Sequence, residues 1–342
     1  HIHDRRQRQM CIRDSLATVP KGLAGITKAH SAVNTTPWKF ISLVICMMAG
    51  TASLPHVMMR YFTSPSVKSA RRSVAWSLFF IFLLYSTAPM LATLSKLSLM
   101  DPTLATGIIG KPIAQVQALD WYQNWNQAKL MFVSDFNGNG TLELNEFFMG
   151  GKAVVLATPE IAGLPYVISG LVAAGGMAAA MSTADGLVLA IANALSHDLY
   201  YKIIDPKAET AKRLIVARVL LVLIGFAGAT IAAMKIQGIL GSVIWAFDFA
   251  MSGLFFPLVL GVWWKRANKQ GAVAGMLLGL ASGTAYLVWV RNGGAGFWGI
   301  TQLTFGIVGS LVSLVSMVVV SLVTPAPDAK IQAMVDEVRI PS

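Results

Sequence analysis

The chain has 342 residues, of which 55% are hydrophobic and 13% are charged, and its formal net charge is +11. A soluble domain carries about 25% charged residues, so this composition argues against a soluble protein and indicates one that lies in a membrane. The cysteines are Cys11 and Cys46, too few for a disulfide framework or a Cys-x-x-Cys metal site.

The first 15 residues are polar and basic and differ from the rest of the chain, so we interpret residues 1–15 as a non-native or disordered segment. Long stretches without charge recur from residue 38 onward, and a bilayer core needs about 20 apolar residues in a helix. These stretches predict seven membrane spans, at residues 38–59, 73–97, 163–200, 213–234, 238–264, 270–290 and 298–323. The expected fold class is an all-α membrane protein.

Basic residues predict the orientation of these spans. The connections after the first, third and fifth spans are rich in Lys and Arg, as the positive-inside rule expects of cytoplasmic loops. This placement accounts for the net charge without nucleic acid, which we do not expect as a partner. The first span then enters from outside, residues 98–160 form an extracellular insertion, and residues 324–342 form a cytoplasmic tail. The expected location is the inner (cell) membrane of a bacterium.

A pair of hydroxyl side chains, Ser182 and Thr183, follows a run of small residues in the middle of the third span. Hydroxyl oxygens and unwound backbone carbonyl groups are ligands that hold Na⁺ at membrane depth in transporters. The alternative is that each hydroxyl bonds back to the carbonyl four residues earlier and has no further role.

Two carboxylates are also expected at membrane depth, Asp185 in the third span and Asp248 in the fifth. A charge in that position costs on the order of 2.5–3.5 kcal/mol, so each is expected to face a cavity, a cation or a partner group. A structural role in helix pairing is the alternative for both.

The segment 135–146 matches the twelve-residue EF-hand calcium loop, with a glycine at the turn position. A helix is expected over 118–134, and a second is expected to begin within 144–149. Few carboxylates predict weak affinity, roughly 10⁻⁴–10⁻³ M. An Asn/Gly-rich turn without calcium is the alternative. The candidate calcium ligands are Asp135, Asn137, Asn139, the Thr141 carbonyl, Glu143 and Glu146.

Three stretches carry a resemblance to a known family. They are residues 50–63 (GTASLPHVMMRYFT), residues 178–183 with 194–200 (AAAMST and ALSHDLY), and residues 256–272 (FPLVLGVWWKRANKQGA). Together they resemble the sodium:solute symporters, and the acetate and other monocarboxylate permeases among them. The resemblance covers nearly everything from residue 16 onward.

The resemblance implies a fold of five plus five helices in an inverted repeat, of which residues 16–323 would form a partial domain that starts at the sixth core helix. Its sodium ligands in the eighth core helix would fall on the Ala179 carbonyl and the Ser182 and Thr183 hydroxyls. Asp185 is a candidate for a second cation or proton site. Asp248 would lie on the helix that lines the substrate cavity, where acetate-type permeases have a small residue. The EF-hand-like loop is absent from most of the family.

The expected function is sodium-coupled symport of a small organic solute, with a monocarboxylate such as acetate as the first candidate. No enzyme activity is expected, because the spans hold no nucleophile–base pair or metal cluster. The alternatives are a nutrient-sensing membrane protein with a transporter-like fold, and transport of another solute class, such as an amino acid, with proton coupling.

The ions and partners follow from this function. Sodium is the expected coupling ion, and calcium is the candidate ion of the external loop. The expected partners are the solute, the lipid bilayer and the preceding helices of the same protein. A small membrane subunit is a further candidate.

Overall fold

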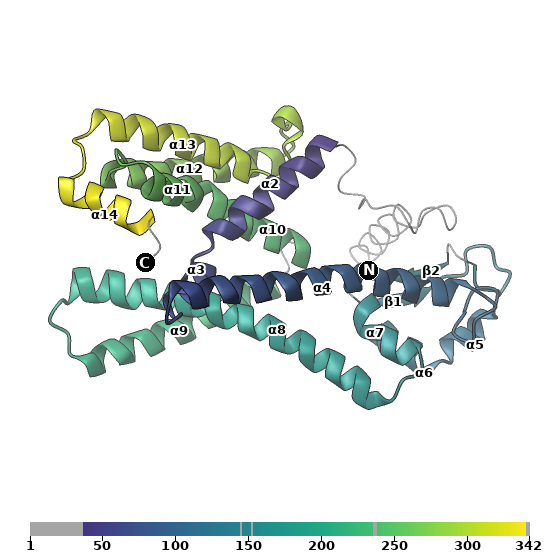
Figure 1. Cartoon of the computed structure of the whole chain (residues 1–342). Coiled ribbons are helices and arrows are strands. Elements are labelled where there is room, and N and C mark those ends of the chain that lie inside the picture. Colours follow the sequence, from purple (N-terminus) through teal and green to yellow (C-terminus); the bar gives the residue numbers. More distant parts are fainter. Residues whose placement is uncertain (1–36, 144–145, 152, 235–237, 340–342) are drawn as a thin grey trace. The chain divides into compact units, whose positions relative to one another are not determined.

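The computed structural model of the chain describes residues 37–143, 146–151, 153–234 and 238–339 (Figure 1). Helices dominate these residues, which include one two-stranded sheet. The expected class, an all-α membrane protein, is confirmed. The segment 1–15, which the sequence suggests to be non-native or disordered, lies outside the described residues.

Six helical stretches of the described residues are long and apolar enough to cross a membrane, which indicates a multi-pass membrane protein. A seventh apolar helix, α2 (Pro37–Ser53), has 17 residues. The six are α4 (Val67–Met100), α8 with the π-helical segment η2 (Tyr166–Asn193 and Ala194–Ile204), α9 (Thr210–Ala233), α10 with the π-helical η3 and α11 (Ile239–Ala250, Met251–Phe255 and Phe256–Trp263), α12 (Lys269–Arg291) and α13 (Gly306–Val323).

The first expected span, 38–59, is divided in the structure. Helix α2 ends at Ser53 and helix α3 (Pro55–Phe62) begins two residues later. Proline lacks a backbone N–H and disfavours helical dihedral angles in the residue before it, here Leu54. The 17 residues of α2 are fewer than the roughly 20 that a straight crossing of the hydrocarbon core requires.

The last expected span, 298–323, begins later than the hydropathy pattern suggests. A 3₁₀ turn, η4 (Phe297–Gly299), contains Trp298 and Gly299 with φ angles of 48° and 75°. A regular α-helix cannot pass through dihedral angles of this sign. The helix α13 therefore starts at Gly306 and continues to Val323, while the tail forms the short helix α14 (Ala329–Arg339).

The described residues form two compact units, one of residues 72–181 and one of residues 37–71 and 182–339. The first unit contains a folded segment between α4 and α8, which the sequence predicted only as an extracellular insertion over 98–160. Its elements are α5 (Ile113–Gln117), α6 (Asp120–Gln127), the antiparallel strands β1 (Met131–Val133) and β2 (Phe147–Met149), and α7 (Val154–Ile161).

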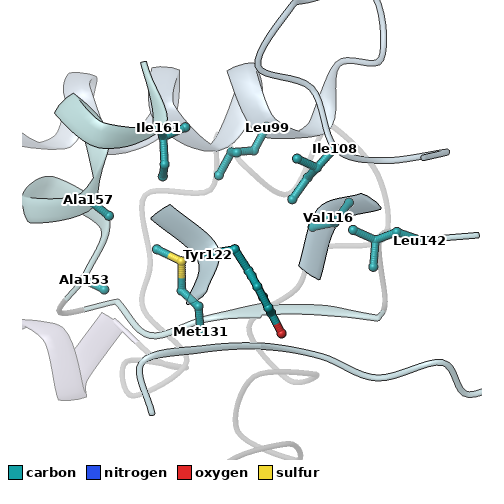
Figure 2. Packing of buried hydrophobic residues seen from close by; sticks show 9 residues of the cluster. All are labelled: Leu99, Ile108, Val116, Tyr122, Met131, Leu142, Ala153, Ala157 and Ile161. Atoms are coloured by element: carbon teal, nitrogen blue, oxygen red, sulfur yellow. The ribbon is translucent and has the colours of Figure 1, made fainter. Parts of the chain in front are cut away.

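This segment has its own hydrophobic core (Figure 2). Trp125 of α6 donates a hydrogen bond of 2.9 Å to the Glu160 carboxylate of α7, and the Ser95 and Thr158 hydroxyls, 2.7 Å apart, join α4 to α7. Burial of each large apolar side chain contributes about 1.5–3 kcal/mol, so the segment is a structured unit. The core residues are Leu99, Ile108, Val116, Tyr122, Met131, Leu142, Ala153, Ala157 and Ile161.

In the second unit, α12 packs closely against α13 and η3, because α12 carries a glycine at every fourth position from Gly271 to Gly283. A Cβ atom added at Gly279 would lie 2.1 Å from the Ser252 carbonyl oxygen of η3, and one added at Gly309 of α13 would lie 2.3 Å from the Ser252 hydroxyl. Small residues allow this approach in lipid, where the hydrophobic effect does not drive helices together.

Candidate functional site

The predicted sodium ligands lie within one continuous helix. Ala179, Ser182 and Thr183 belong to α8, and all three are exposed in this structure. Residues three and four apart occupy the same face of an α-helix, so the Ala179 carbonyl and the Ser182 and Thr183 hydroxyls can point to one side. In the predicted cation site, these groups of α8 would form one wall.

Asp185 lies one turn after Ser182 on the same helix face and is also exposed. A carboxylate there adds negative charge beside the two hydroxyl oxygens, which suits a cation. The four residues lie on successive turns of α8, and a cation site formed by them is a proposal.

Asp248 has different surroundings. It lies near the end of α10, and its side chain is completely buried among α2, α13 and the π-helical η3. The thiol of Cys46 from α2 and the backbone N–H groups of Phe305 and Gly306 face its carboxylate. Neither carboxylate oxygen completes a regular hydrogen bond with a described residue. The carboxylate is thus enclosed by donor groups and has no cationic partner among the described residues.

The EF-hand-like loop folds into a defined structure. Asp135 accepts hydrogen bonds from the backbone N–H groups of Gly138 at 2.7 Å and Gly140 at 3.1 Å. The φ angles of these glycines are 70° and 71°, a region that favours glycine. Glu146 is fully buried and accepts one bond from the Phe136 N–H and another from the Glu143 N–H, at 2.9 and 3.0 Å.

The remaining candidate ligands converge on the same loop. The side-chain amides of Asn137 and Asn139 both donate to the Glu143 carboxylate, at 2.8 and 3.0 Å, and the side-chain oxygen of Asn139 accepts from the Thr141 N–H at 2.8 Å. No group of three or more His, Cys, Asp or Glu side chains within metal-binding reach occurs in the described part of the chain. A calcium site here would therefore depend on amide and carbonyl oxygens as well as carboxylates.

The helix expected before this loop is present but ends earlier than predicted, and the helix expected after it is wrong. Helix α6 ends at Gln127, Lys129 has a φ angle of 58°, and strand β1 follows. On the other side, strand β2 occupies Phe147–Met149, and the Phe132 and Phe148 rings stack 4.8 Å apart across the pair. The aromatic and branched residues of β1 pack better in a paired strand than in an exposed helix. The loop therefore connects a β-hairpin.

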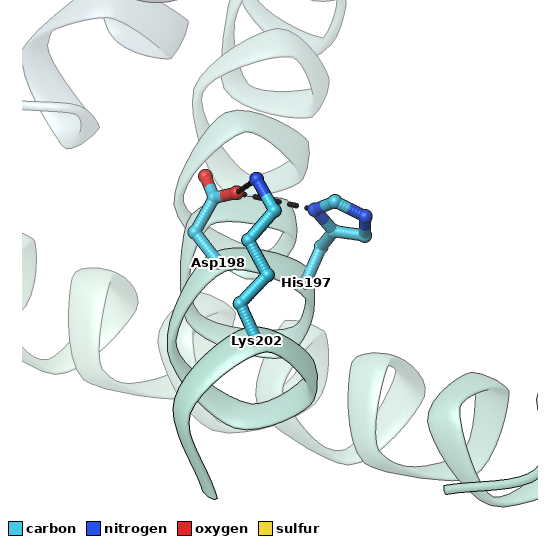
Figure 3. Close-up of polar contacts among 3 residues, drawn as sticks. All are labelled: His197, Asp198 and Lys202. Carbon is cyan, nitrogen blue, oxygen red and sulfur yellow. Dashed lines mark hydrogen bonds and ion pairs between the residues drawn. The ribbon is translucent and has the colours of Figure 1, made fainter. Parts of the chain in front are cut away.

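The end of the third span carries a polar cluster in the π-helical segment η2 (Figure 3). Lys202 donates a hydrogen bond of 2.9 Å to the Asp198 carboxylate, and the His197 Nδ1 atom lies 3.1 Å from the same oxygen. His197 and Asp198 also line a cavity of about 540 Å³ with Pro55 and Asn193. The side chains of His197, Asp198 and Lys202 are more than half exposed, which is typical of a helix end at the membrane–water interface.

Cys46 and the π-helical segments are the features that the sequence analysis missed. Cys46 lies close to Asp248 although about 200 positions separate the two residues in the sequence, and no local pattern predicts this contact. The π-helical η3 begins three residues after Asp248. Single π-helical turns are frequent at functional sites, but hydropathy does not distinguish them from α-helix.

Comparison with known proteins identifies the wider context. Residues 152–279 match the model of the sodium:solute symporter family. The chain is similar to an uncharacterized symporter of Cupriavidus necator, with 40% identity over 310 residues that cover 88% of this chain and 44% of that protein. It is also similar to a monocarboxylic acid transporter of Corynebacterium glutamicum, with 27% identity over 255 residues that cover 74% of this chain and 39% of that protein. The chain thus spans less than half the length of these two relatives.

Proposed function

Because the resemblance to the sodium:solute symporter family is confirmed by these matches, we propose that the chain is the later part of a secondary transporter. It takes part in sodium-coupled symport of a small organic solute. The similarity to a monocarboxylic acid transporter makes a monocarboxylate such as acetate the first candidate substrate.

The observation that carries the sodium proposal is the polar face of α8. Ser182, Thr183 and the Ala179 carbonyl occupy one side of a helix that belongs to the family match. No residue in the most apolar stretch of this helix is buried within the structure. The face is therefore open to helices that would complete a cation site, with Asp185 as a further ligand.

The proposal includes a membrane arrangement. The helices missing from this chain relative to its longer relatives would precede α2 and supply the other sodium ligands. The short basic connections favour a cytoplasmic C-terminal end, and the protein would reside in a bacterial inner membrane. The folded segment between α4 and α8 is then extracellular. The inverted repeat of five plus five helices belongs to this proposal.

Two alternatives differ in what they predict. A nutrient sensor would bind the solute without accumulating it across a membrane. A proton-coupled transporter of another solute, such as an amino acid, would accumulate that solute in a pH gradient without sodium. Uptake of labelled acetate, pyruvate and an amino acid by vesicles that contain the full-length protein separates these cases.

Replacement of both hydroxyls tests the sodium site. In the full-length protein, the double substitution Ser182→Ala with Thr183→Ala should abolish sodium-dependent uptake, because two oxygen ligands are lost. Thr230→Ala is a matched control, since the Thr230 hydroxyl of α9 bonds to the Phe226 carbonyl of its own helix at 2.8 Å. Unchanged sodium dependence in the double variant would rule out this site.

A second proposal concerns the external loop, which we propose to bind calcium weakly and thereby to order the β-hairpin. It is supported by the match to the EF-hand spacing and by side-chain oxygens of Asp135, Asn137, Asn139 and Glu146 that accept hydrogen bonds from backbone N–H groups of the same loop. The low number of carboxylates places the expected dissociation constant near 10⁻⁴–10⁻³ M. Calcium here has a structural role and does not drive transport.

A further inference from the structure

The buried carboxyl group of Asp248 lies in a membrane-spanning helix, outside the sodium site proposed on α8. Its exposed fraction is 0%, and neither of its oxygens completes a hydrogen bond with a described residue. Ionisable groups in this position are rare because they are costly, and those that occur commonly carry protons or ions. The surroundings of Asp248 indicate which of these it binds.

The first neighbour is the start of helix α13. The helix begins at Gly306, and its N-cap residue, Phe305, supplies no capping side chain. The first N–H groups of a helix lack partners within it and carry a partial positive charge. The N–H groups of Phe305 and Gly306 face the Asp248 carboxylate, and a Cβ atom added at Gly306 would lie 2.9 Å from its Oδ1 atom. An ionised Asp248 is therefore stabilised by the end of a neighbouring helix.

The second neighbour is Cys46 of α2, whose buried thiol faces the same carboxylate. The Ser252 hydroxyl of η3 donates a hydrogen bond of 2.7 Å to the backbone carbonyl of Asp248, not to its carboxylate. No Lys, Arg or His side chain of the described residues faces the carboxyl group from α2, η3 or α13. The backbone N–H groups around it have no lone pair for a metal cation, and a cysteine sulfur is a soft ligand that does not favour Na⁺.

This arrangement leaves the charge of Asp248 dependent on the position of α13. While the N-terminus of α13 lies against α10, its N–H groups and the thiol offset part of the cost of a buried anion. If α13 moves away from α10, the anion loses these donors and has no cation to replace them. Uptake of a proton from solvent water then neutralises the group: the carboxylate and a hydronium ion give a carboxylic acid and a water molecule.

We propose that Asp248 is a proton-binding site, whose carboxyl group exchanges between an anion that the start of α13 stabilises and a neutral acid. The π-helical turn η3 begins three residues after Asp248, and its Ser252 lies close to Gly309 of α13, so the carboxyl group is enclosed where α10, η3 and α13 meet. The inference rests on the proposed transport function, because proton exchange would accompany the motions of transport.

Infrared difference spectroscopy of the full-length protein in lipid tests the proposal independently of transport. The wild-type protein should show the C=O stretching band of a protonated carboxyl group that titrates with pH. The band should be absent in Asp248→Asn and should change frequency in Asp248→Glu. A band with the same amplitude and pH dependence in Asp248→Asn would overturn the proposal, as would the absence of any such band in the wild-type protein.

A second pair of variants tests the proposal even if Asp248→Asn does not fold. Cys46→Ser keeps a donor beside the carboxylate, whereas Cys46→Ala removes it. The pH midpoint of the band should shift more in Cys46→Ala than in Cys46→Ser, and identical midpoints in both variants and the wild type would contradict the assignment. Sodium-driven uptake by the same preparations reports on the proposed function separately, so a transporter without the band would refute only this inference.

Discussion

Two groups of membrane helices differ in how much of their apolar surface is covered. In the most apolar stretches of α10 with α11, of α12 and of α13, 33%, 28% and 33% of the residues are buried. In the corresponding stretches of α4, α8 and α9, 0% are buried. The first group also contains the closest glycine contacts and the buried carboxyl group of Asp248.

The two groups of helices differ in whether the helices that they pack against belong to this chain. Helices α12 and α13 pack against each other through glycine and serine within this chain, so they form a framework. Helix α8 presents the carboxyl group of Asp185 on a face that is exposed in this structure, and ionisable groups in membrane helices almost always face the bundle interior or a water-filled cavity. The contrast matches a chain that spans less than half the length of its relatives.

The largest expected effect comes from filling a close contact in the covered group. Gly279→Leu would place side-chain atoms where the Ser252 carbonyl oxygen already lies, 2.1 Å from the Cβ position. We expect loss of folded protein, measured as the yield of monodisperse material after extraction in detergent. Gly225→Leu in α9 is the matched control, because no atom lies within 4 Å of its Cβ position.

The same control sharpens the comparison in the full-length protein. If helices outside this chain cover α8 and α9, Gly225→Leu or Gly175→Leu should lower the yield of the full-length protein more than that of the isolated chain. Equal tolerance of both substitutions in the two proteins would contradict the idea that these faces are covered by missing helices.

A smaller effect is expected in the folded segment between α4 and α8, which has a core of its own. Met131 is completely buried there, and replacement of a buried methionine by alanine costs about 2–5 kcal/mol. Met131→Ala should speed proteolysis of the segment in detergent-solubilised protein, whereas Leu104→Ala, at an exposed position, should not. Equal proteolysis rates in the two variants would show that the core does not hold the segment together.

The smallest effect is expected from calcium at the loop. A ligand at 100 times its dissociation constant stabilises a site by about 2.7 kcal/mol, and about 10 mM calcium reaches that ratio only at the strong end of the expected affinity range. Calcium should slow proteolysis of the wild-type segment, and Asp135→Asn should remove this protection. Asp120→Asn, outside the loop, is the control. Protection that persists in Asp135→Asn would exclude the proposed site.

Hydropathy predicted the positions of most membrane helices because the physical requirement is local. The expected spans 213–234 and 270–290 differ from α9 and α12 by at most three residues at either end. The errors arose where backbone geometry determines where a helix begins or ends. Pro55 divides the first span. Because Trp298 has a positive φ angle, the last helix begins later in the sequence than predicted.

The candidate site was predictable only in part. The Ser182 and Thr183 pair, Asp185 and the calcium-loop spacing are local patterns, which a sequence displays directly. The enclosure of Asp248 by Cys46 and the start of α13 depends on long-range packing and could not be predicted. The same holds for the hairpin around residues 135–146, where pairing with β2 outweighed the helical pattern expected before the loop.

Sodium-driven accumulation tests the central claim most directly. Vesicles that contain the full-length protein are given labelled acetate, lactate or pyruvate with an inward sodium gradient, and then with a matched potassium gradient. The proposed function predicts accumulation of at least one of these solutes above its external concentration with sodium, and its loss with potassium. Equal accumulation under both gradients, or none of any solute, would contradict sodium-coupled transport of a monocarboxylate.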